Sequence, residues 1–69
     1  RYKEALEVYS IATQYNPNYG LAYYDMGVAL MSMNNLEKSL RYFLRAKNLE
    51  PDLVFPKEVK ASLGFDKRE

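Results

Sequence analysis

Apolar side chains recur at helical spacing along most of the chain, in three stretches. Residues 2–15 and residues 36–49 each place apolar side chains on one face. Residues 19–33 are apolar nearly all round, with Asp25 as the single charge, which is typical of a helix buried on more than one side. Strand-like alternation between turn signals does not occur. The pattern therefore predicts an all-α fold.

Turn-forming residues separate these stretches. Pro17 follows the first stretch and Pro51 follows the third, and proline opposes continuation of a helix. The dipeptide Asn34-Asn35 lies between the second and third stretches and suits a tight connection between two helices. We therefore expect one helix within residues 1–17 and an antiparallel helical hairpin within residues 18–51.

A shorter helical stretch follows in residues 53–64. Pro56 suits the first position of a helix, and Gly64 suits its end. We expect this helix to cap the preceding ones, and residues 65–69 to form a frayed tail. The side that would face the other helices carries Phe55, Val59 and Leu63.

The composition removes most kinds of chemistry. A chain of 69 residues has a small core, which usually depends on disulfides, a metal or a partner. There is no Cys and no His, so disulfides, thiolate zinc sites and the commonest general base are excluded. We expect no catalytic residues, no cofactor and no metal, and hence no enzyme. The lack of Cys is compatible with the cytoplasm or another reducing compartment without indicating one.

Charge and hydropathy narrow the possible partners. Ten basic and nine acidic residues give a net charge of +1, whereas nucleic-acid-binding modules have a clear basic excess. No run approaches eighteen apolar residues, so we expect no membrane insertion. The first residues contain neither a signal-peptide core nor an initiator Met, and we expect a mature or excised piece of a longer protein.

The chain also repeats itself with a period of 34 residues. Pro17 and Pro51 are related by this offset, and the residues before them keep the same size class in register. The aligned pairs are Tyr2 with Leu36, Ala5 with Ser39, Leu6 with Leu40, Tyr9 with Phe43 and Ala12 with Ala46. A period of 34 in a helical chain indicates a solenoid of helical hairpins.

These residues resemble the signature of the tetratricopeptide repeat (TPR) family: an aromatic, x2, Leu, Gly, x2, Tyr, then Ala, x3, Phe, then Pro. The full repeat carries Tyr23, Met26, Gly27, Leu30, Ser39, Phe43, Ala46 and Pro51, and the half-repeat before it carries Ala5, Tyr9, Ala12 and Pro17. Tyr23, Met26, Leu30 and Ser39 depart from the family's residues but keep their approximate size. The resemblance covers residues 1–52 and implies a right-handed α-solenoid fragment of about one and a half repeats.

The signature residues have packing roles under this interpretation. Gly27, Ser39 and Ala46 are small because two helices cross closely there, since side chains at the contact set the spacing between helices. The larger signature residues fill the space between helices. Pro17 and Pro51 end one repeat and set the angle to the next.

The resemblance also implies a binding groove, lined by the first helix of each repeat. The groove positions are Leu21, Tyr24, Asp25, Val28, Met31 and Ser32. Four of them, Leu21, Tyr24, Val28 and Met31, form one apolar stripe. The Lys and Asn of the carboxylate clamp found in some family members are absent from these positions. We expect a protein or peptide partner, apolar or amphipathic, in this groove. Alternatively, a neighbouring repeat, a terminal helix or a second copy covers it.

Self-assembly is therefore the alternative function. Residues 1–17 resemble the second helix of a repeat whose first helix is missing, and solenoids need about three repeats. We expect the side with Tyr2, Leu6, Tyr9 and Ile11 to lack cover, which favours a homo-oligomer. The basic stripe of Lys38, Arg41 and Arg45 is either a solvated outer face or a contact for an acidic protein surface or a phosphate.

Overall fold

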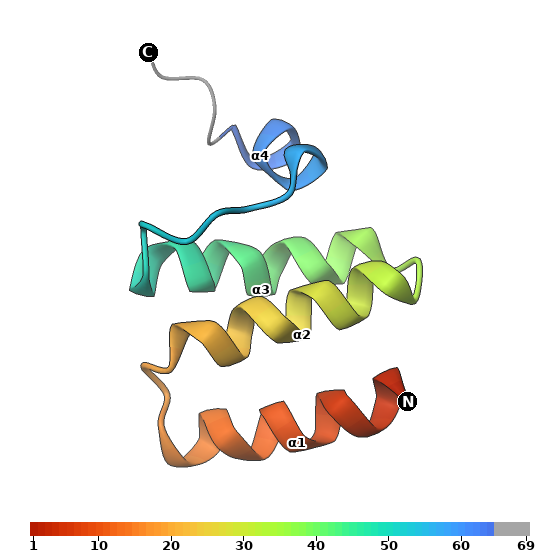
Figure 1. Ribbon diagram of the computed structural model, residues 1–69, viewed down its shortest axis with the longest axis vertical. Coiled ribbons are helices and arrows are strands. Elements are labelled where there is room, and N and C mark those ends of the chain that lie inside the picture. Colours follow the sequence, from red (N-terminus) through yellow and green to blue (C-terminus); the bar gives the residue numbers. More distant parts are fainter. Residues whose placement is uncertain (65–69) are drawn as a thin grey trace.

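The computed structural model describes residues 1–64 and contains only helices in this part of the chain (Figure 1). The predicted frayed tail, residues 65–69, lies outside the described residues. The helices are α1 (Tyr2–Tyr15), α2 (Gly20–Ser32), α3 (Leu36–Leu49) and α4 (Lys57–Leu63). The all-α fold built from helical hairpins is thus confirmed.

Three of the helices lie side by side, and the chain reverses direction between them (Figure 1). The middle helix, α2, contacts both α1 and α3, and α4 contacts α3. The hairpin of α2 and α3 forms the centre of the molecule, with α1 on one side and α4 on the other (Figure 1). This order explains why α2 is apolar nearly all round, since two of its sides are covered by other helices.

The connection between α2 and α3 uses the asparagine pair. Asn34 has a φ of 64°, a left-handed conformation that asparagine tolerates better than most residues. The Asn35 side chain then accepts a hydrogen bond from the backbone N–H of Lys38 at 3.3 Å, and so caps the start of α3. The two asparagines thus close the hairpin with complementary roles.

Close approach of α2 and α3 is centred on Gly27. A Cβ atom at this position would lie 2.8–2.9 Å from three carbon atoms of the Phe43 ring, so only glycine fits. Ser39, Phe43 and Ala46 on α3 are each 0% exposed. The Ser39 hydroxyl donates a hydrogen bond to the carbonyl of Leu36 at 2.7 Å, and so its burial leaves no unpaired donor.

The last helix packs onto this core through a short extended segment. Pro56 has a ψ of 151°, so α4 begins one residue later, at Lys57. Phe55 and Val59 are buried in the core formed with Phe43. Gly64 ends the helix in the left-handed conformation, with a φ of 76°.

The first helix is less well covered than its equivalent in the repeat. Ala5, Tyr9 and Ala12 are half-buried, whereas the residues 34 positions later are completely buried. The expectation that Leu6 and Tyr9 lack cover is wrong, because both are half-buried and pack against the core. Leu6 and Tyr9 lie on the side of α1 that faces the core, whereas other apolar side chains of α1 remain exposed. The latter include Tyr2, Val8, Ile11 and Tyr15.

The first testable prediction concerns Gly27. Gly27→Leu should lower the free energy of unfolding by about 3 kcal/mol or more, because the side chain overlaps the buried Phe43 ring and the helices must separate. Urea unfolding followed by circular dichroism measures this change. The matched control, Val28→Leu at the next and exposed position, should stay within about 0.5 kcal/mol of the parent. A Gly27→Leu variant as stable as the parent would contradict the close contact.

Candidate functional site

The six predicted groove residues lie on α2, and they are not equally accessible. Leu21 and Val28 are 46% and 39% exposed, and Ser32 is exposed. Asp25 and Met31 are half-buried, as is Tyr24. Leu21, Asp25, Val28 and Ser32 follow a four-three-four spacing and therefore share one face of the helix. This face combines two accessible apolar side chains with a carboxylate and a hydroxyl.

Tyr24 is engaged by the chain's own C-terminal segment. Its hydroxyl donates a hydrogen bond to the carbonyl of Val54 at 2.7 Å. Its ring centroid lies 5.4 Å from that of Phe43 and 5.2 Å from that of Phe55. These are geometries that aromatic pairs prefer, edge-to-face for the first and tilted for the second. Tyr24 therefore forms the border of the α2 face and anchors residues 53–56 to it.

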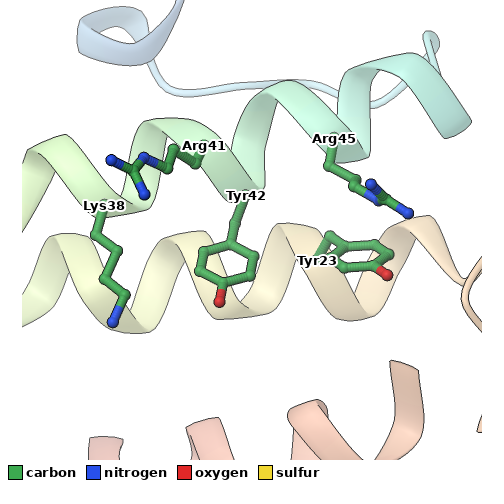
Figure 2. A pocket seen from close by; sticks show the side chains of 5 residues that line it. All are labelled: Tyr23, Lys38, Arg41, Tyr42 and Arg45. Carbon is green, nitrogen blue, oxygen red and sulfur yellow. The ribbon is translucent and has the colours of Figure 1, made fainter. Parts of the chain in front are cut away.

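A second surface, the basic-aromatic pocket, was only partly recognised in the sequence. It is an open pocket of about 500 Å³ (Figure 2). Its lining residues are Tyr23, Lys38, Arg41, Tyr42 and Arg45. The sequence indicated the three cations as a stripe, but it did not indicate that two tyrosines from different helices lie beside them. Tyr23 matched the family signature and was therefore interpreted as a core residue alone.

The tyrosines and one arginine have a defined arrangement in this pocket. The ring planes of Tyr23 and Tyr42 are 18° apart, with centroids at 6.4 Å. The guanidinium carbon of Arg45 lies 5.1 Å from the centroid of the Tyr23 ring, within cation–π range (Figure 2). Most of Tyr23 is buried in the core, so its ring is a fixed support for Arg45.

Sites of other kinds are not found in residues 1–64. No group of three His, Cys, Asp or Glu side chains within this range is placed to hold a metal ion. None of the helices in the described part of the chain is long and apolar enough to cross a membrane. Every buried side-chain nitrogen or oxygen atom among these residues has a hydrogen-bond partner, so no polar group is left aimed into the core.

The fold and its surfaces define a class of protein: a stack of helical hairpins that presents surfaces to other proteins. Two family models match the chain, one described as TPR repeat over residues 1–34 and one as Tetratricopeptide repeat over residues 20–53. The chain belongs to the tetratricopeptide repeat family, a non-catalytic fold that generally mediates protein–protein interaction. Comparison with curated proteins and with solved structures gave no match.

The two matched segments overlap on α2. The first contains α1 with α2, and the second contains α2 with α3. α2 therefore takes part in two helix–helix contacts, one with α1 and one with α3. The face with Leu21 and Val28 is what remains of its surface once both neighbours are in place.

The second prediction tests the segment that Tyr24 anchors. Phe55→Ala should lower the free energy of unfolding by about 3 kcal/mol, because Phe55 is 5% exposed and packs against Tyr24 and Phe43. The adjacent Val54 is 81% exposed, so Val54→Ala is the control and should change stability by less than about 0.5 kcal/mol. Chemical denaturation measures both. Equal effects of the two substitutions would show that the segment is not docked.

Proposed function

We propose that this chain is a protein-interaction module and that the exposed face of α2 is its binding groove. The observation that carries the proposal is the pair Leu21 and Val28, which lie on one face and remain 46% and 39% exposed after α1, α3 and α4 have packed. Exposed apolar side chains grouped on one surface are typical of binding sites. The repeat boundaries proposed with it are residues 1–17, 18–51 and a cap in residues 53–64.

The chemistry of this face favours an amphipathic helix or an extended apolar peptide as the partner. Leu21 and Val28 supply apolar contact area, and Met31 at the border supplies an adaptable side chain. Asp25 lies between the two apolar residues and offers an acceptor for a Lys, Arg or backbone N–H of the partner. A partner with apolar residues at helical spacing and one basic residue fits this arrangement.

The third prediction uses peptides selected on the protein itself. The immobilised protein is used to select peptides from a displayed random library. The selected sequences should have apolar residues three and four positions apart. Leu21→Asp with Val28→Asp should weaken binding of the selected peptides by at least about 100-fold, since each introduced carboxylate must be desolvated on binding. Isothermal titration calorimetry measures the affinities, and circular dichroism checks helicity.

The matched control places the same substitutions on another exposed apolar surface. Val8→Asp with Ile11→Asp changes two exposed apolar residues of α1 and adds the same charge. Peptide binding should survive in this variant. Loss of binding in the control alone, or unchanged binding in the α2 variant, would reject the groove.

Self-assembly is the second candidate function, and it rests on α1. Val8, Ile11 and Tyr15 follow a three-four spacing, so they form one exposed apolar stripe. No residue of α1 is fully buried, although its signature positions Ala5 and Ala12 are equivalent to completely buried ones on α3. A helix from a second copy packed against α1 would cover this surface.

The fourth prediction separates this candidate from the groove. If α1 is a contact between copies, the melting temperature should rise with protein concentration between about 1 and 200 µM, since association stabilises the folded state. Ile11→Glu with Tyr15→Glu should abolish this dependence and give a monomer in sedimentation velocity. A monomeric parent over the whole range would reject self-assembly and leave the groove proposal intact.

A further inference from the structure

The basic-aromatic pocket lies on the opposite side of α2 from the groove. Tyr23 follows Leu21 by two residues, and two residues turn a helix by about 200°. The pocket is therefore a separate surface, and its role does not depend on the groove proposal. We propose that this pocket binds an acidic segment of a protein partner, in an extended conformation and with several separate carboxylates.

Three cations of the pocket lie close together along α3. Lys38, Arg41 and Arg45 are spaced three and four residues apart on α3, and like charges at these spacings destabilise a helix. Among the described residues, no carboxylate forms an ion pair with any of the three. Glu37 lines a smaller hollow beside Lys38 and Arg41, but it does not line the pocket. An acidic partner would relieve this repulsion.

The arrangement of the cations favours several carboxylates over a single anion. In Figure 2 the guanidinium groups of Arg41 and Arg45 point in opposite directions along α3, and the Lys38 chain extends across the hairpin toward α2. The three charges are therefore spread along the pocket and do not converge on one point, as they would around a phosphate. From Lys38 to Arg45 the helix rises by about 10.5 Å, a length that about three extended residues span.

The tyrosines supply preorganisation and apolar contact. Arg45 is held over the Tyr23 ring, so its N–H groups are positioned before binding and less side-chain entropy is lost. Tyr42 is half-buried beside Tyr23 and offers a ring surface for the backbone or an apolar side chain between the carboxylates. Its phenolic hydroxyl is an additional donor for a carboxylate.

The experiment uses three labelled peptides with the whole chain. The first has four consecutive acidic residues in a Gly/Ser background, the second has the corresponding amides, and the third has the amides and one phosphoserine. Fluorescence anisotropy should show binding of the acidic peptide alone. Its affinity should fall about tenfold or more between about 50 mM and 500 mM NaCl, because salt screens exposed charges. Stronger binding of the phosphoserine peptide than of the acidic peptide would overturn the proposal in favour of a phosphate site.

Variants that remove positive charge test where the acidic peptide binds. Arg41→Gln with Arg45→Gln should raise the dissociation constant of the acidic peptide about tenfold, since two exposed charge contacts are lost. The matched control, Lys3→Gln with Lys57→Gln, removes the same net charge from exposed positions on α1 and α4 and should change it less than about twofold. Equal weakening in both variants would mean non-specific attraction and would overturn the proposal.

Two further measurements guard against a folding artefact. Arg41→Lys keeps the charge at the position that is not stacked on Tyr23, and this variant should retain most of the affinity. Its circular dichroism spectrum should match that of the parent. In the unaltered protein, NMR resonances of Tyr23 and Tyr42 should shift on addition of the acidic peptide. Shifts confined to Leu21 and Val28 would place the peptide in the groove and would overturn the assignment to this pocket.

Discussion

The contact between Gly27 and the ring of Phe43 is the constraint on which the rest of the structure depends. Because Gly27 has no side chain, α3 lies close enough to α2 for Phe43 to be completely buried. The buried ring then offers its edge and face to Tyr24 and Phe55, with Phe43 and Phe55 centroids 5.9 Å apart and nearly perpendicular. The docking of the C-terminal segment is thus a consequence of one close approach between two helices.

Two equivalent positions, 34 residues apart in the sequence, show what neighbouring helices contribute to burial. Phe43 is covered by α2 and α4 and is 0% exposed, whereas Tyr9, at the equivalent position, is half-buried. Since burial of apolar area supplies most of the favourable free energy of folding, the core around Tyr9 is the weaker of the two. In a one-dimensional stack each unit depends on its neighbours. α1 therefore contributes less to the core than α3 does.

The sequence was sufficient to predict the helices, because the signals that define them are local. Prolines 17 and 51, the asparagine pair and Gly64 end or separate elements, and the observed bounds differ from the expected stretches by about one residue. The exception is the start of α4, where Pro56 remains outside the helix. What the sequence could not predict depends on contacts between distant residues. Tyr24 was expected to line the groove, and the sequence did not indicate that its hydroxyl reaches Val54, thirty positions later.

The same limitation explains the basic-aromatic pocket. Lys38, Arg41 and Arg45 were evident as a stripe, but Tyr23 joins them only because α2 and α3 pack together. Tyr23 stands where the family has Trp, and this single ring has two environments: one side packs in the core and the other supports Arg45. The packing that stabilises the hairpin therefore also positions a charge on its surface. For this reason the hairpin presents two separate surfaces, the exposed apolar side chains of α2 and the basic side chains of α3.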